Sequence, residues 1–363
     1  MKKVLLKLHL YLGLVFGVII AVIGVSGAFI SYQSEILEVL NKSSIKVVPQ
    51  TTTISLDKMA LNVQKLYPNS PITGVYVYSD KSRSVRFSVA VEPGKRGIKN
   101  VFVNPYNGEI LPQYRYQGFF NFMLNVHKRL SLGGAGREVV AVSTVLLIFF
   151  SISGVILYYK ALKYNFIKAM KIPLKGSLHA LSYKWHCALG IWFLVPILLM
   201  CLTGLYWSYD WYRSGFLKVL NYERVVKKRV VSAPKVSQIS GLDTVFDEFG
   251  KKFEYESAWV RFPLNLTNQE ISFYKKGYTH IRQTNLVRID AKNGEILSQN
   301  LYEEKPLNAK FASSVLPLHS GEFFGEIGKF IFMVASFLMA LFGATGYILW
   351  FKKHKKKAKK VKA

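Results

Sequence analysis

Long apolar runs separated by mixed segments are the dominant pattern of this chain of 363 residues. A spanning helix needs about 20 mostly apolar residues. Four runs meet that length, at residues 10–32, 139–159, 189–209 and 330–351, and none carries an acidic or basic side chain in its interior. The pattern predicts four transmembrane helices. Because half of all residues are hydrophobic, the chain is not an ordinary soluble domain.

The long segments between the spans carry a second pattern, a short amphipathic helix followed by strands and an Asn-Gly turn. The turn occurs at Asn107-Gly108 and again at Asn293-Gly294, each followed by Glu-Ile-Leu. Asn-Gly between β-rich runs is typical of a hairpin turn. Each long segment is therefore predicted to form a small α+β domain. The expected helices are residues 56–67 and 242–253, and the expected strands are 74–78, 84–91, 99–103, 258–262, 271–274 and 285–289.

The spans themselves are repeated. The first and third open with His-x-x-x-Gly, at His9 and His186, and reach a hydroxyl–Gly pair 17 residues after the histidine. The second and fourth follow His127 and His319, and their hydroxyl–Gly pair comes 26 residues later. The four pairs are Ser26-Gly27, Thr203-Gly204, Ser153-Gly154 and Thr345-Gly346. We interpret the chain as two fused repeats, each with two spans enclosing a small domain.

Charge orients this arrangement. Three short segments contain no Asp or Glu: the N-terminus with three lysines, residues 160–184 with six and residues 352–363 with eight. With four spans these segments share one side, which the positive-inside rule makes cytoplasmic. The uneven distribution of the net charge of +28 favours membrane topology over nucleic acid binding. The long segments hold 32 basic and 21 acidic residues, and they are expected outside.

The predicted organisation follows the chain in eight parts. They are a first span (1–32), an extracytoplasmic domain (33–125), an interfacial helix with the second span (126–160), a cytoplasmic connector (161–184), a third span (185–209), a second extracytoplasmic domain (210–317), an interfacial segment with the fourth span (318–351) and a basic cytoplasmic tail (352–363). A cleavable signal peptide is the alternative for the first part. The counterpart of that segment in mid-chain favours an uncleaved span.

The repeated histidines are the candidate chemistry. Because the spans alternate in direction, His9 and His186 are expected near the cytoplasmic face, and His127 and His319 near the outer face. One histidine at headgroup depth needs no function. Four at repeated spacings, paired by face, predict two haem sites, since imidazole is a usual axial ligand of haem iron. Glycines separate His127 and His319 from their spans, so we expect both on interfacial helices or turns.

Alternatives remain open for these sites. His179 lies seven residues before His186, on the same helical face, and competes as the inner ligand. Zinc needs three or four protein ligands, and Cys187 beside His186 has no counterpart in the other half. Cys187 and Cys201 are interpreted as small apolar side chains of the bundle. The basic residues that could meet haem propionates are Lys7 and Lys184 for the inner pair, and Lys128, Arg129 and Arg137 for the outer pair.

The span openings, the hydroxyl–Gly pairs and the Asn-Gly-Glu-Ile-Leu endings resemble the PepSY-associated transmembrane family of iron-regulated membrane proteins. The resemblance covers nearly the whole chain, and the family includes ferric-siderophore reductases of the bacterial inner membrane. It implies two b-type haems, the inner one held by His9 and His186 and the outer one by His127 and His319. It also implies periplasmic PepSY-like domains.

The expected function is electron transfer from the cytoplasmic side, through both haems, to a ferric chelate or siderophore outside. No phosphate loop or nicotinamide fingerprint is visible in the sequence, so a quinol or a flavoprotein must supply the electrons. The alternative is a non-enzymatic membrane protein whose PepSY-like domains bind peptides or partner proteins. The sequence does not distinguish the chelate, the donor, the potentials or the oligomeric state.

Overall fold

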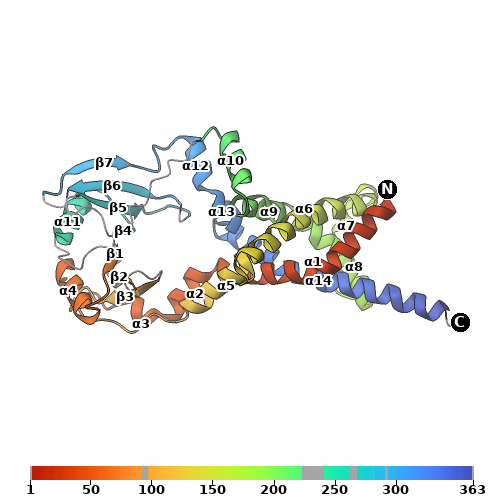
Figure 1. The fold of residues 1–363 in the computed structure, drawn as a ribbon, viewed down its shortest axis with the longest axis horizontal. Coiled ribbons are helices and arrows are strands. Elements are labelled where there is room, and N and C mark those ends of the chain that lie inside the picture. Colours follow the sequence, from red (N-terminus) through yellow and green to blue (C-terminus); the bar gives the residue numbers. More distant parts are fainter. Residues whose placement is uncertain are drawn as a thin grey trace. The chain divides into compact units, whose positions relative to one another are not determined.

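The computed structural model of the chain describes residues 2–90, 97–222, 241–261, 268–280, 282–290 and 293–361. These residues form two compact units, one helical and one built on a β-sheet (Figure 1). Some sequence predictions lie outside the described residues: the ends of two expected strands at Val91 and Phe262, Ala291 and Lys292 beside the second Asn-Gly turn, and the last two residues of the basic tail.

The helical unit comprises Met1–Gln33, Gly118–Tyr222 and Ser314–Ala363. Its long helices match the predicted spans, and shorter helices precede or follow them. The elements are α1 (Lys2–Ser31), α5 (Gln117–Arg129), α6 (Gly133–Tyr164), α7 (Phe166–Met170), α8 (Leu178–Trp192), α9 (Leu194–Ser208), α10 (Asp210–Val219), α13 (Val315–Ser320), the 3-10 turn η1 (Glu322–Phe324) and α14 (Gly325–Val361).

Three stretches of the described residues are long and apolar enough to cross a membrane by themselves: α1, α6 and Glu322–Lys352. The third predicted span is broken. Helices α8 and α9 meet at an angle of 64° and make a fourth crossing only if they are counted together. The break has a local cause, since Pro196 lies in the first turn of α9 and has no N–H to continue the hydrogen-bond ladder of α8. The apolar pattern alone did not indicate this bend.

Helix α1 packs along both α14 and α6. Glycine allows the close approach to α14, because a Cβ on Gly24 would lie 2.4 Å from the backbone oxygen of Ser336, and one on Gly343 would lie 3.2 Å from that of Gly17. Without a strong hydrophobic drive between helices in lipid, such small residues let backbones pack tightly. The unit is thus held by helix contacts between the two halves of the chain.

The sheet unit comprises Ser34–Gln117 and Glu223–Ser313. It joins what the sequence predicted as two small domains, because the strands of both segments form one antiparallel sheet in the order β3-β2-β1-β4-β5-β6-β7. The strands are β1 (Ile72–Tyr78), β2 (Val85–Ala90), β3 (Ile98–Val103), β4 (Ser257–Arg261), β5 (Asn268–Tyr274), β6 (Asn285–Asp290) and β7 (Ile296–Asn300). The helices are α2 (Gln33–Leu40), α3 (Lys42–Ile45), α4 (Leu56–Leu66), α11 (Leu242–Lys252) and α12 (Leu307–Ser313).

The junction of the sheet is the pairing of β1 with β4, in which Val75 faces Val260 and Val77 faces Ala258. Each half would otherwise expose one edge strand with unpaired backbone N–H and C=O groups. Pairing the two edges satisfies both. This explains why the two segments form one sheet although the sequence pattern of each is complete in itself.

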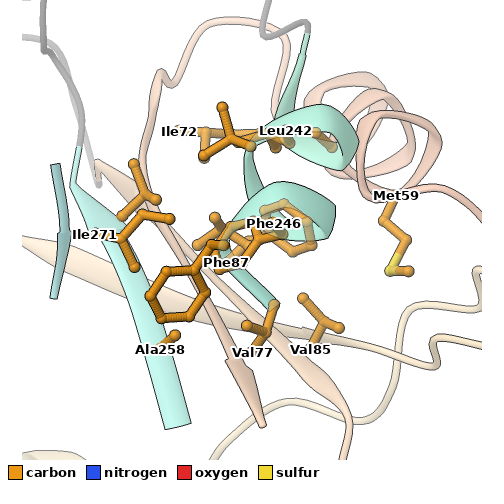
Figure 2. Packing of buried hydrophobic residues seen from close by; sticks show 14 of the residues in the cluster. Met59, Ile72, Val77, Val85, Phe87, Leu242, Phe246, Ala258 and Ile271 are labelled. Carbon is orange, nitrogen blue, oxygen red and sulfur yellow. The ribbon is translucent and has the colours of Figure 1, made fainter. Parts of the chain in front are cut away.

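One face of the sheet carries the core, and α4 and α11 cover it (Figure 2). Buried side chains alternate along the strands, as in β2, where Val85, Phe87 and Val89 point inward. The two Asn-Gly turns were predicted correctly, with Gly108 at φ +75° and Gly294 at φ +72°. Each turn closes a hairpin through paired backbone hydrogen bonds, and the second hairpin adds β7, which the sequence did not predict.

Candidate functional site

The helical unit brings the four repeated histidines together as two pairs. His9 on α1 faces His186 on α8 with ring centroids 6.3 Å apart, and His127 on α5 faces His319 on α13 at 6.1 Å. Each pair takes one ring from each half of the chain. His179 is exposed on α8, and His186 is the residue of that helix whose ring lies against His9.

Three of the rings are held by the hydroxyl groups of the repeated pairs. The Nδ1 atom of His9 lies 2.7 Å from Oγ of Ser153, and that of His186 lies 2.8 Å from Oγ1 of Thr345. In the outer pair, Nδ1 of His319 lies 3.0 Å from Oγ1 of Thr203. In each case the hydroxyl group belongs to a pair that follows a different histidine in the sequence, so the contact joins neighbouring helices and is not the repeated spacing itself. From the sequence, the small residues of these pairs were interpreted as allowing close approach of a flat macrocycle or of another helix backbone, and hydrogen bonds to the histidines were not predicted.

The proton on each of these rings can be assigned from the other bonds of the hydroxyl groups. Ser153 donates its one hydroxyl proton to the carbonyl of Phe150 at 3.2 Å, and Thr345 donates to the carbonyl of Leu341 at 2.7 Å. Thr203 likewise donates to a carbonyl of its own helix. Each hydroxyl oxygen then accepts from Nδ1–H. The neutral ring keeps its lone pair on Nε2, the form in which histidine binds a metal.

His127 reaches the same state by another route. Its Nδ1 lies 2.8 Å from the backbone oxygen of Ile23, which can only accept, so Nδ1 again carries the proton. The repeated hydroxyl at this position, Ser26, bonds instead to carbonyls of its own helix. Gly27 provides the space for the ring, because a Cβ there would lie 2.8 Å from Cε1 of His127.

Aromatic and apolar groups surround the paired rings. Phe150 contacts His9, Phe342 contacts His186 and Trp207 contacts His319, at centroid distances between 5.3 and 5.5 Å. For the outer pair, which lies outside the candidate spans, burial lowers the pKa of His127 and lowers the pKa of His319 to about 3. Both outer rings are therefore neutral near pH 7.

The separation of the two rings in each pair fits two imidazole ligands that would share one metal. Imidazole nitrogens bind metals at about 2 Å, so rings whose centroids lie 6.3 or 6.1 Å apart could both reach one ion. In the described part of the chain, no group of three or more His, Cys, Asp or Glu side chains could hold a metal ion. A site with two protein ligands suits a porphyrin, because the macrocycle supplies four further nitrogens.

The basic residues expected near the pairs give a mixed result. Lys128 contributes positive charge at both His127 and His319, whereas Arg137 forms an exposed ion pair with Glu138 at 3.1 Å. The helical unit also contains a buried lysine that the sequence did not single out: Lys329 is 5% exposed, and its Nζ lies 3.9 Å from Oε1 of Glu322 and 4.7 Å from the ring centre of Tyr32. Its position one residue before the apolar run 330–351 was the available signal.

The two cysteines are free thiols, with Cys201 buried in α9 and Cys187 partly buried in α8. Both lie within the helical unit, as predicted for small side chains of a bundle.

Apolar helices of spanning length, paired neutral histidines and a sheet unit inserted between the helices define a membrane protein with two candidate cofactor sites. The chain belongs to the family described as the PepSY-associated TM region, whose model matches residues 6–353. No curated protein matches the chain significantly.

Proposed function

We propose that the protein is a di-haem b electron carrier of the bacterial inner membrane that reduces ferric chelates. The observation that carries this proposal is the state of the four histidines. Each pair has ring centroids about 6 Å apart, and each Nδ1 is engaged so that Nε2 keeps its lone pair. The described residues contain no group of three or more His, Cys, Asp or Glu side chains that could hold a metal ion by itself.

In this proposal α8 and α9 together form the third of four spans. Both chain ends and the lysine-rich connector lie in the cytoplasm, because the positive-inside rule applies to such short segments. The sheet unit then lies outside. His9 and His186 hold the inner haem, and His127 and His319 hold the outer one. Seventeen residues of helix separate His9 from Ser26, a rise of roughly 26 Å, which matches the hydrocarbon thickness.

Bound haem would supply one-electron chemistry between Fe(III) and Fe(II). The chain would supply neutral imidazole ligands and would set their basicity through Ser153, Thr345, Thr203 and the carbonyl of Ile23, since the partner of Nδ1 tunes the electron donation of a ligating imidazole. The apolar surroundings exclude water from both pairs. A quinol or a flavoprotein supplies electrons on the cytoplasmic side, and a ferric chelate accepts them outside, where reduction weakens its hold on the metal.

The test is the visible spectrum of the purified full-length protein from iron-replete cells. We expect a low-spin b-type spectrum and two haems per chain. His9→Ala and His186→Ala should remove one haem, and His127→Ala and His319→Ala the other. His179→Ala is the matched control and should keep both. A colourless protein would exclude the proposal and favour the peptide-binding alternative. With the spectrum established, a donor-coupled assay on several ferric chelates tests the reductase step.

A further inference from the structure

The sheet unit has a second face, opposite to the one covered by α4 and α11. Along a strand, side chains alternate between the two faces. The neighbours of the core residues Val75, Val77, Ala258, Val260 and Phe273 therefore point to this second face. They form a row across the strands β1, β4 and β5, which we call the aromatic strip: Tyr78, Tyr76, Trp259 and Tyr274.

The rings of the aromatic strip contact one another across the sheet, with one stacked pair and two tilted pairs. Tyr76 and Trp259 are parallel within 1° at a centroid distance of 5.1 Å, and Trp259 lies 5.1 Å from Tyr274. Tyr78 adds a further ring 5.1 Å from Tyr76. All four side chains are partly exposed. No core packing explains this row, because the core lies on the other face of the sheet.

Two arginines flank the aromatic strip on the side of β2. The guanidinium carbon of Arg86 lies 4.2 Å from the ring centre of Tyr76, and that of Arg83 lies 4.3 Å from that of Tyr78. Arg83 is paired with Glu38 at 3.1 Å. The Nε atoms of Arg83 and Arg86 are both buried without a hydrogen bond, but among the described residues Arg86 also has no carboxylate partner. A guanidinium has five N–H donors, and leaving them unmatched in a partly buried site is costly.

The same face of the sheet carries another arginine, on β6, whose charge is neutralised. Arg288 on β6 binds Glu270 on β5 through two nitrogens, at 3.0 and 2.9 Å. Positive charge is thus compensated near β6 and left uncompensated beside Tyr76. A ligand that fits this asymmetry carries negative charge for Arg86 and flat rings for the aromatic strip, because arginine binds planar anions and stacks on aromatic faces.

We propose that the aromatic strip and Arg86 bind a ferric chelate of the catecholate class, whose ligand is both aromatic and anionic. This inference rests on the proposed reduction of ferric chelates and names the substrate class for it. Catechol rings would stack on Tyr76 and Trp259. The negative charge of the chelate, which arises because three catecholate dianions outweigh one Fe(III), would meet the Arg86 guanidinium. A hydroxamate chelate has neither the rings nor this charge.

The experiment measures binding of a gallium(III) tris-catecholate to the full-length protein in detergent by titration calorimetry. Gallium(III) resembles Fe(III) as a ligand centre but does not accept an electron, so binding is separated from reduction. Arg86→Gln should weaken binding about tenfold, in line with the loss of one charge-assisted hydrogen bond. Arg288→Gln is the matched control, because it removes the same charge from the same face at a site that is already neutralised. It should leave binding unchanged.

Two further measurements keep the outcome clear. Arg86→Lys retains the charge without the planar fork and should bind with intermediate affinity. Trp259→Leu removes a stacking surface and should also weaken binding. Circular dichroism of each variant checks that the sheet is intact. The inference is overturned if the wild type does not bind the probe, if gallium trihydroxamate binds as tightly, or if Arg86→Gln and Arg288→Gln behave alike. Haem content, measured on the same samples, reports separately on the proposed function.

Discussion

Asp57 and Asp243 cap each other's helices. The carboxylate of Asp57 accepts hydrogen bonds from the backbone N–H groups of Gly241 and Leu242, both at 3.1 Å, at the start of α11. The carboxylate of Asp243 accepts from Leu56 at 2.7 Å and from Asp57 at 3.2 Å, at the start of α4. These first-turn N–H groups have no partner within their own helix. These reciprocal hydrogen bonds connect the two repeats of the chain.

Asp243→Ala should therefore destabilise a helix in the other half of the chain. Loss of a capping carboxylate costs about 1–2 kcal/mol, and here the cost falls on α4. Hydrogen exchange measured by mass spectrometry should show faster exchange at the amides of Leu56 and Asp57. The control is Asp247→Ala, which removes an exposed carboxylate from the same helix. If neither variant changes the hydrogen-exchange rates of α4, the reciprocal capping by Asp57 and Asp243 does not stabilise this helix.

The same contact makes the sheet unit sensitive to pH. Burial, and next the nearby Asp243 carboxylate, raise the pKa of Asp57 above its ordinary value of 3.8, although hydrogen bonds from Leu242 and Gly241 oppose the shift. A raised pKa means that the folded state binds this proton more tightly than the unfolded state does. The contribution of protonated Asp57 to the stability of the folded state is then largest at low pH, and it is lost as the pH rises through the folded-state pKa.

Asp57→Asn should reduce the dependence of the free energy of unfolding on pH over this range. The measurement is urea unfolding of the full-length protein followed by circular dichroism, at several values from about pH 4 to pH 6. Wild type should lose stability relative to Asp57→Asn as the pH rises over this range. Asp247→Asn serves as the control and should keep the wild-type slope. Equal slopes in wild type and Asp57→Asn would contradict the assigned direction.

Thr345→Val should weaken haem binding at the proposed inner site without removing a proposed ligand. Valine has nearly the shape of threonine but cannot accept the hydrogen bond from Nδ1 of His186. Loss of such a hydrogen-bond partner typically lowers the affinity for the bound metal group about 10- to 100-fold. The reduction potential of the inner haem should rise, because a less basic imidazole stabilises Fe(III) less. Haem titration and a spectroscopic redox titration measure the two effects.

The matched control for that variant is Thr144→Val on α6. Thr144 bonds only to the carbonyl of Val140 in its own helix, at 2.8 Å. It should leave both the affinity and the potential unchanged. A potential that moves equally in both variants would indicate a general effect of losing a hydroxyl group from the bundle.

If the proposed haem sites are correct, Gly27→Ala should remove the outer haem and spare the inner one. The added methyl group would lie 2.8 Å from Cε1 of His127, closer than such contacts permit, so the ring must leave its present position, and we expect the outer pair to be disturbed. Gly13→Ala on the same helix is the control, since nothing lies within 4 Å of its added methyl group. Haem counted per chain should fall from two to one in the first variant only. Two retained haems in Gly27→Ala would show that His127 is not a ligand in its present position.

Local patterns in the sequence were sufficient for much of this protein. Apolar length predicted the membrane helices, and the helix and strand patterns predicted α4, α11 and six of the seven strands with boundaries close to those observed. The Asn-Gly turns followed from the backbone freedom of Gly108 and Gly294. Repeated spacings singled out the four histidines and predicted which two would pair, because a spacing along a helix is also a distance along its axis.

Contacts between distant parts of the chain needed the three-dimensional structure. The pairing of β1 with β4 depends on two edges that each look complete in the sequence, and the bend between α8 and α9 depends on how one proline is accommodated. The sequence located the hydroxyl–Gly pairs, but their bonds to the histidine rings arise only where helices pack side by side. Arg86 is one basic residue among many until the fold places it on Tyr76 without a carboxylate. Periodicity records which face a residue occupies, whereas the partner on that face is set by the packing of the whole chain.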